Sequence, residues 1–71
     1  MTAICPDIPN HAVYPIGKTA ELLGMSRSRL LYYCELGTRQ GGIAYTIPRG
    51  ETRKKFKGAD IIAFWRRKQG I

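Results

Sequence analysis

The chain has 71 residues and a formal net charge of +7, and both numbers limit what it can do. A domain of this size buries only about 60% of the surface that its unfolded chain exposes, so an enclosed catalytic cavity is not expected. The apolar fraction of 44% excludes a wholly disordered chain. From Arg49 onward eight lysines and arginines face two acids, so this part carries +6 of the net charge. The asymmetry favours a polyanionic partner, most often nucleic acid, over ordinary solubilising charge.

The composition indicates no metal, cofactor or membrane segment. Cys5 and Cys34 are too few for a disulfide framework, and with His11 as the one histidine they make a poor zinc site. Cys34 is expected to be a small core residue. No secretory signal is recognisable, and the longest apolar run, residues 61–65, is too short to span a bilayer. The expected location is the cytoplasm, in association with the nucleoid.

The N-terminal residues 1–12 are predicted to form an irregular arm, because they contain two prolines and show no hydrophobic period. Ile4 and Ile8 either tether this arm to the body or leave it mobile, and both alternatives stay open. Residues 13–15 are expected to be extended, since a residue that precedes proline is disfavoured in helical dihedrals.

Residues 17–23 and 27–36 are predicted to form two helices joined by a tight turn. Gly24 can adopt the left-handed conformation that ends the first helix, and Ser26 can cap the second by accepting a backbone N–H bond. Gly37 is expected to end the second helix in the same left-handed way. Apolar side chains fall where the helices would face each other and a shared core: Leu23, Met25, Leu30 and Tyr33.

The second helix presents a polar, cationic outer face. At 100° per residue, Ser28, Tyr32 and Glu35 lie opposite its core side. Arg29 and Leu31 flank them. A short helix held in this way after a tight turn is the geometry that places a helix in the major groove of DNA. Leu31 could touch a thymine methyl group, pack on the arm or meet a partner protein, and the sequence does not choose among these.

The remainder is predicted to form a β-hairpin and a third helix. Residues 43–47 alternate large apolar with smaller side chains, and after a turn at residues 48–52 the chain can return as a second strand at residues 53–56. Residues 59–69 are expected to be helical. The buried apolar face of this helix is expected to contain Ile61, Phe64 and Trp65. Its last turn carries three cations, which also interact favourably with the helix dipole: Arg66, Arg67 and Lys68.

Taken in order, these elements resemble the winged helix-turn-helix DNA-binding domains of excisionases and MerR-like regulators. Residues 20–28 (AELLGMSRS) are similar to that family's first helix, glycine turn and capped recognition helix. Residues 30–37 (LLYYCELG) are similar to the Leu-Arg-Tyr-Tyr-Glu stretch of MerR regulators, although Leu31 stands where those carry arginine. Residues 53–61 (RKKFKGADI) resemble the return strand of the wing and the start of the next helix.

The resemblance implies a mainly α fold with three helices and a small β-hairpin, formed by residues 13–71 behind the arm. It further implies a recognition helix in the major groove and a wing over the adjacent minor groove or backbone. Because 71 residues leave no room for the long dimerisation helix and effector domain of MerR regulators, we expect an excisionase. Such proteins assist a recombinase by binding and bending DNA beside an attachment site.

Two other functions remain open, namely a minimal transcriptional regulator of a phage, plasmid or transposon and a protein-interaction module such as an anti-repressor. An enzyme is not expected, because His11 has no paired carboxylate at a useful spacing. The expected partners are double-stranded DNA and an integrase or recombinase, with no membrane. We expect a monomer in solution that binds DNA cooperatively.

The residues predicted to contact DNA come from the start of the second helix and from the wing. Arg29 can pair bidentately with guanine, whereas Arg27 is expected to meet phosphate. The wing cations are expected to neutralise the backbone or enter a narrow minor groove. The full set is Ser26, Arg27, Ser28, Arg29, Tyr32, Arg49, Thr52, Arg53, Lys54 and Lys55.

Overall fold

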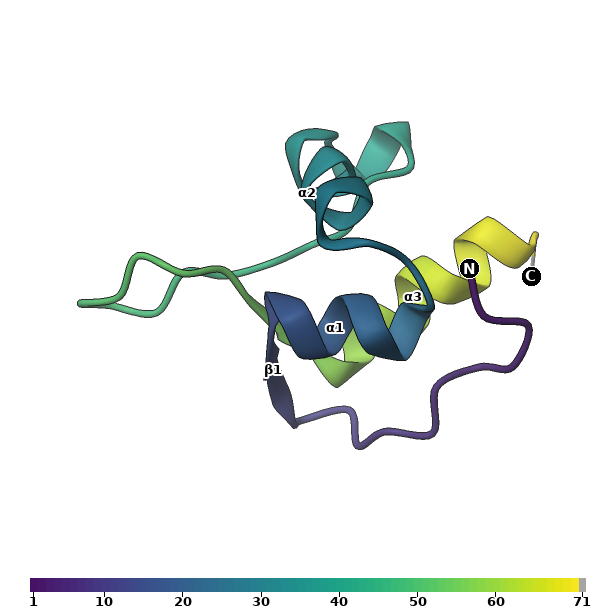
Figure 1. The fold of residues 1–71 in the computed structure, drawn as a ribbon, viewed down its shortest axis with the longest axis horizontal. Helices are drawn as coiled ribbons and strands as arrows, with labels where there is room; N and C mark the ends of the chain where they lie inside the picture. Colours follow the sequence, from purple (N-terminus) through teal and green to yellow (C-terminus); the bar gives the residue numbers. More distant parts are fainter. Residues whose placement is uncertain (71) are drawn as a thin grey trace.

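Three helices and a two-stranded antiparallel sheet form the described part of the chain, residues 1–70, in the computed structural model (Figure 1). The fold is mainly helical, as the sequence predicts, and its layout is consistent with a winged helix. Ile71, the last residue of the expected domain, lies outside the described residues. The elements in order are β1 (Val13–Pro15), α1 (Ile16–Leu23), α2 (Arg27–Glu35), the 3-10 turn η1 (Thr38–Gln40), β2 (Lys55–Lys57) and α3 (Gly58–Gln69).

The turn between α1 and α2 forms as predicted. Gly24 is left-handed, with φ 68° and ψ 40°, and its backbone N–H donates to the carbonyls of Ala20 and Glu21. The Ser26 hydroxyl accepts a 3.1 Å hydrogen bond from the backbone N–H of Arg29, which caps α2. Ala20 of α1 is 3% exposed and belongs to the hydrophobic core. Local backbone requirements therefore set the path of the chain into α2.

The end of α2 differs from the expectation. The helix stops at Glu35, and Gly37 has φ −66°, so the left-handed cap predicted there is wrong. The chain continues into η1, and the left-handed residue is Gly41, with φ 86°. The backbone N–H of Ile43 then donates to the carbonyl of Tyr33 at 3.2 Å. A carbonyl near the end of α2 is thus satisfied by the returning chain, which removes the need for a local glycine cap.

The two-stranded sheet is not the hairpin that the sequence predicts. β2 pairs with β1, which precedes the first helix, and Tyr14 lies opposite Phe56. The predicted partner, residues 43–47, makes one isolated bridge, in which Thr46 and Lys55 exchange backbone hydrogen bonds of 2.9 and 2.7 Å. Side chains beyond this bridge have no core to bury against, so regular pairing ends there. The intervening segment, residues 44–54, projects from the body and is called the wing below (Figure 1).

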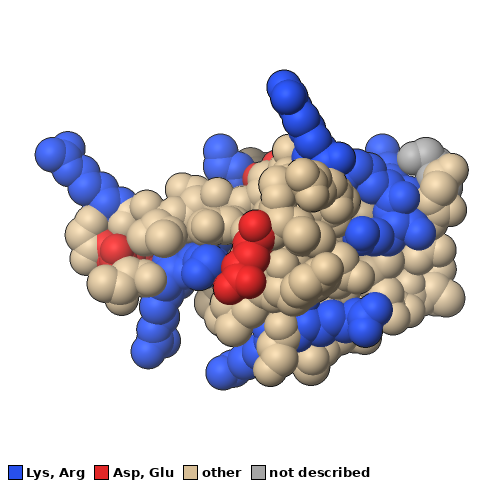
Figure 2. All heavy atoms as spheres, turned by 90° about the horizontal axis from the view of Figure 1, so that it is seen from above, with Lys and Arg blue, Asp and Glu red and all other residues tan. Residues whose placement is uncertain are grey.

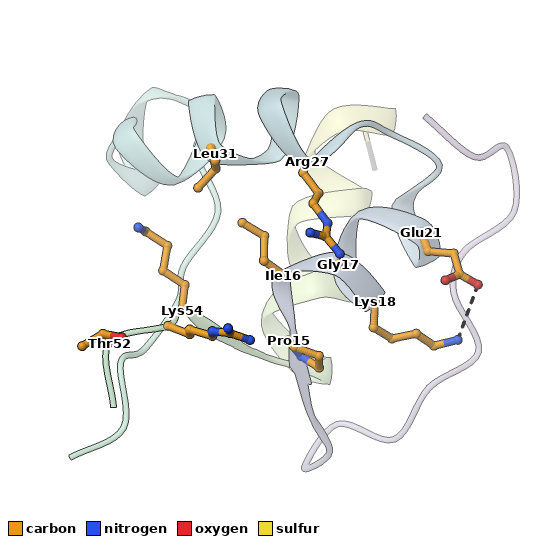
Figure 3. A pocket seen from close by; sticks show the side chains of 10 residues that line it. Pro15, Ile16, Gly17, Lys18, Glu21, Arg27, Leu31, Thr52 and Lys54 are labelled. Carbon is orange, nitrogen blue, oxygen red and sulfur yellow. Dashed lines mark ion pairs between the residues drawn. The ribbon is translucent and has the colours of Figure 1, made fainter. Parts of the chain in front are cut away.

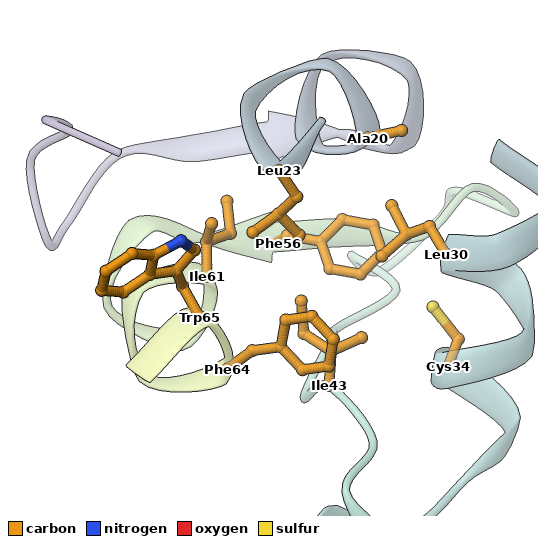
Figure 4. Close-up of a cluster of buried hydrophobic side chains, with 9 residues drawn as sticks. All are labelled: Ala20, Leu23, Leu30, Cys34, Ile43, Phe56, Ile61, Phe64 and Trp65. Atoms are coloured by element: carbon orange, nitrogen blue, oxygen red, sulfur yellow. The ribbon is translucent and has the colours of Figure 1, made fainter. Parts of the chain in front are cut away.

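One hydrophobic core joins the helices to β2 (Figure 4). Cys34 belongs to it, as predicted, and burial raises the pKa of its thiol. The buried hydroxyl of Thr19 donates a 2.9 Å hydrogen bond to the carbonyl of Pro15, so burial leaves it satisfied. The largest fully buried apolar side chains come from all parts of the fold: Leu23, Leu30, Ile43, Phe56, Ile61 and Phe64.

The N-terminal arm is docked on the body although it has no regular secondary structure. The backbone N–H of Thr2 donates to the carbonyl of Leu23 at 2.9 Å, and the Thr2 carbonyl accepts a 3.0 Å hydrogen bond from Trp65 Nε1. Ile8 packs against the core, whereas Ile4 is 79% exposed. Of the two candidate tethers, only Ile8 therefore contributes.

Replacing Gly37 by alanine should leave stability unchanged or raise the free energy of unfolding by about 0.4–1 kcal/mol. The residue has an ordinary negative φ, and no heavy atom lies within 4 Å of the position of an added Cβ. Gly24→Ala is the matched control, because its φ is 68° and an added Cβ would lie 2.9 Å from the Thr2 nitrogen. That variant should lose about 1 kcal/mol or more. Urea unfolding monitored by Trp65 fluorescence measures the free energy of unfolding of both variants. An equal loss of stability in the two would contradict the negative φ of Gly37.

Candidate nucleic-acid interface

A hollow of about 770 Å³ opens between α1, α2 and the wing, and we call it the basic hollow (Figure 3). Residues far apart in the sequence meet here, because the wing returns to β2 beside the start of α1. The lining comes from the β1–α1 junction (Pro15, Ile16, Gly17, Lys18 and Glu21), from α2 (Arg27 and Leu31) and from the wing (Thr52, Arg53 and Lys54).

The basic hollow has an excess of positive charge. Glu21 is its one acid and lies 3.7 Å from the ammonium of Lys18, at side-chain exposures of 75% and 49%. An ion pair this exposed contributes little to stability. Within residues 1–70, the other three cations of the hollow have no ion-pair partner: Arg27, Arg53 and Lys54.

Arg27 reaches from the start of α2 across to α1. A Cβ added to Gly17 would lie 2.6 Å from Arg27 Nη2, so the guanidinium rests directly against the glycine backbone. Figure 3 shows the side chain directed down into the basic hollow, toward the first turn of α1. A larger residue at position 17 would push this guanidinium away.

The structure brings only part of the predicted DNA-contact set together. Ser26 uses its hydroxyl to cap α2. Ser28 and Tyr32 are exposed on α2, and Tyr32 is 57% exposed. Arg49 lies in the wing turn, outside the hollow lining. The predicted residues that share the basic hollow are Arg27, Thr52, Arg53 and Lys54.

Arg29 and Lys55 lie apart from the hollow. The guanidinium of Arg29 is 6.0 Å from the centroid of the Tyr33 ring, and Tyr33 packs edge-on against Phe64 of α3 at 5.1 Å. Because residues two apart on a helix are separated by 200°, Arg27 and Arg29 occupy different flanks of α2. Lys55 is half-buried and lies 3.9 Å from Glu51. Figure 2 shows the lysines and arginines spread over the visible face of the molecule instead of gathered in one patch.

Leu31 aside, sequence reasoning missed five members of the hollow: Pro15, Ile16, Gly17, Lys18 and Glu21. They lie at the end of β1 and in α1, and no local motif marks them as binding residues. For Leu31 the sequence left open a thymine methyl group, the arm or a partner protein, and the structure places it in the hollow at 42% exposure. Only the spatial arrangement of α1, α2 and the wing could have identified these positions.

The wing is connected to the core through Tyr45. Its ring centroid lies 6.3 Å from that of Phe56, yet the side chain is 41% exposed. The ammonium of Lys54 lies 5.3 Å from the Tyr45 ring centroid, on the cation–π scale. Tyr45 therefore anchors the base of the wing without being fully buried.

Two of the three cations that end α3 make structural contacts. Arg67 Nη2 donates a 3.0 Å hydrogen bond to the carbonyl of Gly42. The ammonium of Lys68 lies 4.6 Å from the Tyr33 ring centroid and 5.5 Å from that of Phe64. Arg66 is exposed and forms no ion pair with another described residue. The net charge of this helix end therefore overstates the charge that is free for a ligand.

Comparisons with family models, with curated proteins and with solved structures find no match to this chain. No helix in residues 1–70 combines the length and apolar character needed to cross a membrane. In the same residues, no three His, Cys, Asp or Glu side chains gather in a way that could hold a metal ion.

Replacing Lys54 by methionine should raise the pKa of the Cys34 thiol further. Burial is the main cause of the raised pKa, and the nearby Lys54 ammonium acts against it by stabilising the thiolate. In a Cys5→Ser background, the alkylation rate of Cys34 should therefore shift to higher pH, because less thiolate is present at each pH. Lys57→Met, which removes a cation from β2, is the control. If the pH profile of Cys34 alkylation were unchanged in the Lys54 variant, the Lys54 ammonium would lie too far from Cys34 to affect its pKa.

Arg67→Ala should lower the free energy of unfolding by about 1 kcal/mol, since it removes a hydrogen bond from a charged donor. Arg66→Ala removes the same side chain one residue earlier, where it is exposed and makes no hydrogen bond or ion pair within residues 1–70, and should change stability by less than about 0.5 kcal/mol. Urea unfolding of both variants tests this division. Equal effects would mean that the Arg67 contact with Gly42 contributes nothing.

Proposed function

We propose that this protein binds double-stranded DNA in a sequence-specific manner through α2 and the wing. The observation that carries the proposal is the basic hollow, where three cations without an acidic partner converge from two elements. The guanidinium and ammonium groups there can bind phosphates, which supply most of the affinity of proteins for DNA. The +7 net charge of the whole chain supports a polyanionic partner.

The outer face of α2 is the part proposed to read bases. Leu30 and Cys34 bury the opposite face, so the helix is supported from behind. With its side chains an α-helix is about 10–12 Å across, which matches the width of about 12 Å of the major groove. Ser28 and Tyr32 are exposed on this face, and Arg29 at its edge can pair with guanine.

The wing is proposed to contact the neighbouring backbone or minor groove. It ends in a turn where the Glu51 N–H donates to the Pro48 carbonyl at 2.9 Å and Gly50 has φ 83°. Arg49 is exposed in this turn. An arginine at the end of a projecting loop suits the negative potential of a narrow minor groove.

We propose the role of an excisionase, or recombination directionality factor, that binds and bends DNA beside an attachment site with an integrase as partner. A minimal transcriptional regulator needs the same DNA contacts. An excision assay with and without the protein, run beside a promoter reporter, separates the two roles. Sedimentation with and without DNA tests the proposed monomer and its cooperative binding.

The affinity for duplex DNA should fall steeply with salt. If about four to six phosphates are neutralised, the logarithm of the binding constant should fall against the logarithm of salt concentration with a slope of about −4 to −5. A triple variant of the hollow, Arg27→Met with Arg53→Met and Lys54→Met, should reduce that slope by about three. Fluorescence anisotropy of a labelled duplex measures it.

A matched control removes three cations outside the hollow: Arg39→Met, Lys57→Met and Arg66→Met. Both triple variants lower the net charge equally, so a general charge effect would change the two slopes alike. The proposal requires a clearly larger change for the hollow variant. A wild-type slope near zero would contradict DNA binding by this surface.

A further inference from the structure

The basic hollow contains an apolar floor as well as cations. Leu31 extends from α2 toward Ile16 of α1 (Figure 3), and Pro15 is a further apolar residue of the lining. Leu31 keeps 42% of its surface exposed and shares the hollow with Arg27, Arg53 and Lys54. A ligand that offers an apolar group close to negative charges would complement both parts of this lining.

The arm cannot cover Leu31. It bonds to the other end of α1, where Thr2 meets the Leu23 carbonyl, and to α3 through Trp65. Figure 1 shows the arm leading away from the side on which α2 faces the wing. Of the three partners that the sequence left open for Leu31, an external ligand or partner therefore remains.

Duplex DNA combines the two required chemistries. In the major groove each thymine presents a methyl group, and the phosphates of its strand run alongside. Leu31 lies four residues after Arg27, which places it about one helical turn, or about 6 Å, farther along the same flank of α2. A helix that holds a phosphate with Arg27 would thus carry Leu31 toward a base edge of the adjoining groove.

The distribution of charge favours a duplex over an acidic protein segment as the occupant. The cations extend beyond the hollow to Arg49 in the turn of the wing, and the molecule measures 35 Å along its longest axis. A rigid rod with regularly spaced phosphates can meet such widely separated cations at once, whereas a short acidic segment fills only the hollow.

We infer that Leu31 is a specificity-determining residue that contacts a thymine methyl group while Arg27 and the wing cations bind flanking phosphates. This inference rests on the proposed DNA binding and adds a base preference to it. Leu31 then discriminates through a hydrophobic contact, and base-edge hydrogen bonds come from other residues of α2.

The test removes the methyl group without changing base pairing. A duplex is first enriched from a random-sequence pool by the wild-type protein, and each thymine is then replaced singly by deoxyuridine. At one or two positions the replacement should raise the wild-type dissociation constant about three- to fivefold, the affinity equivalent of burying one methyl group. Leu31→Ala should bind the thymine and deoxyuridine duplexes equally.

Val13→Ala is the matched control, since Val13 is 51% exposed on β1 and lies outside the hollow. This variant should retain the wild-type preference for thymine. A preference that persists in Leu31→Ala, or no deoxyuridine effect in the wild type, would overturn the inference while leaving DNA binding intact. Failure to enrich any duplex would overturn DNA binding as well. Poly-glutamate binding that Leu31→Ala abolishes, with the thymine preference unchanged, would assign the hollow to an acidic protein instead.

Discussion

Burial of Phe56 determines where the wing, α1 and α2 stand relative to one another. Its ring is fully buried and lies near Leu23 of α1 and Leu30 of α2 (Figure 4). Strand alternation then directs Lys55 and Lys57 away from the core. Lys55 also makes the bridge from which the wing departs. One aromatic side chain thus holds β2 in the core and positions the wing beside α2, and the basic hollow forms between them.

Features that depend on neighbours within four residues could be predicted from the sequence. Features that depend on contacts with distant parts of the chain could not. Gly24 and Ser26 behave as predicted, because a helix end needs a left-handed residue or a side-chain acceptor at a fixed offset. Gly37 stands at a similar position but is not left-handed, since residues 42 and 43 return against the end of α2. Only glycine leaves room for this approach at position 42, because a Cβ added there would lie 2.6 Å from the Tyr33 carbonyl oxygen.

The same distinction applies to strand pairing and to the candidate site. Charge and turn signals pointed to Arg27, Arg53 and Lys54, which do converge. The strand β1, however, pairs with the other edge of β2 from residues 43–47, and local sequence gives no sign of this long-range pairing. Lys18 joins the hollow only because β1 and β2 pair. Total charge was a weaker guide, since Arg67 and Lys68 are engaged with Gly42 and Tyr33.

The wing is held to the core at its base and not at its turn. Its base is held by the Thr46–Lys55 bridge and by the contact of Tyr45 with Phe56, while the turn at residues 48–51 lies beyond both. Segments with few buried contacts open at low free-energy cost, so the wing should adjust more readily than α2, which rests on the core. Ordering the wing on binding costs free energy, and this cost lowers the affinity for the ligand. The rigid α2 is therefore the element suited to discriminate between bases, and the wing is suited to bind phosphates, whose recognition tolerates small changes in position.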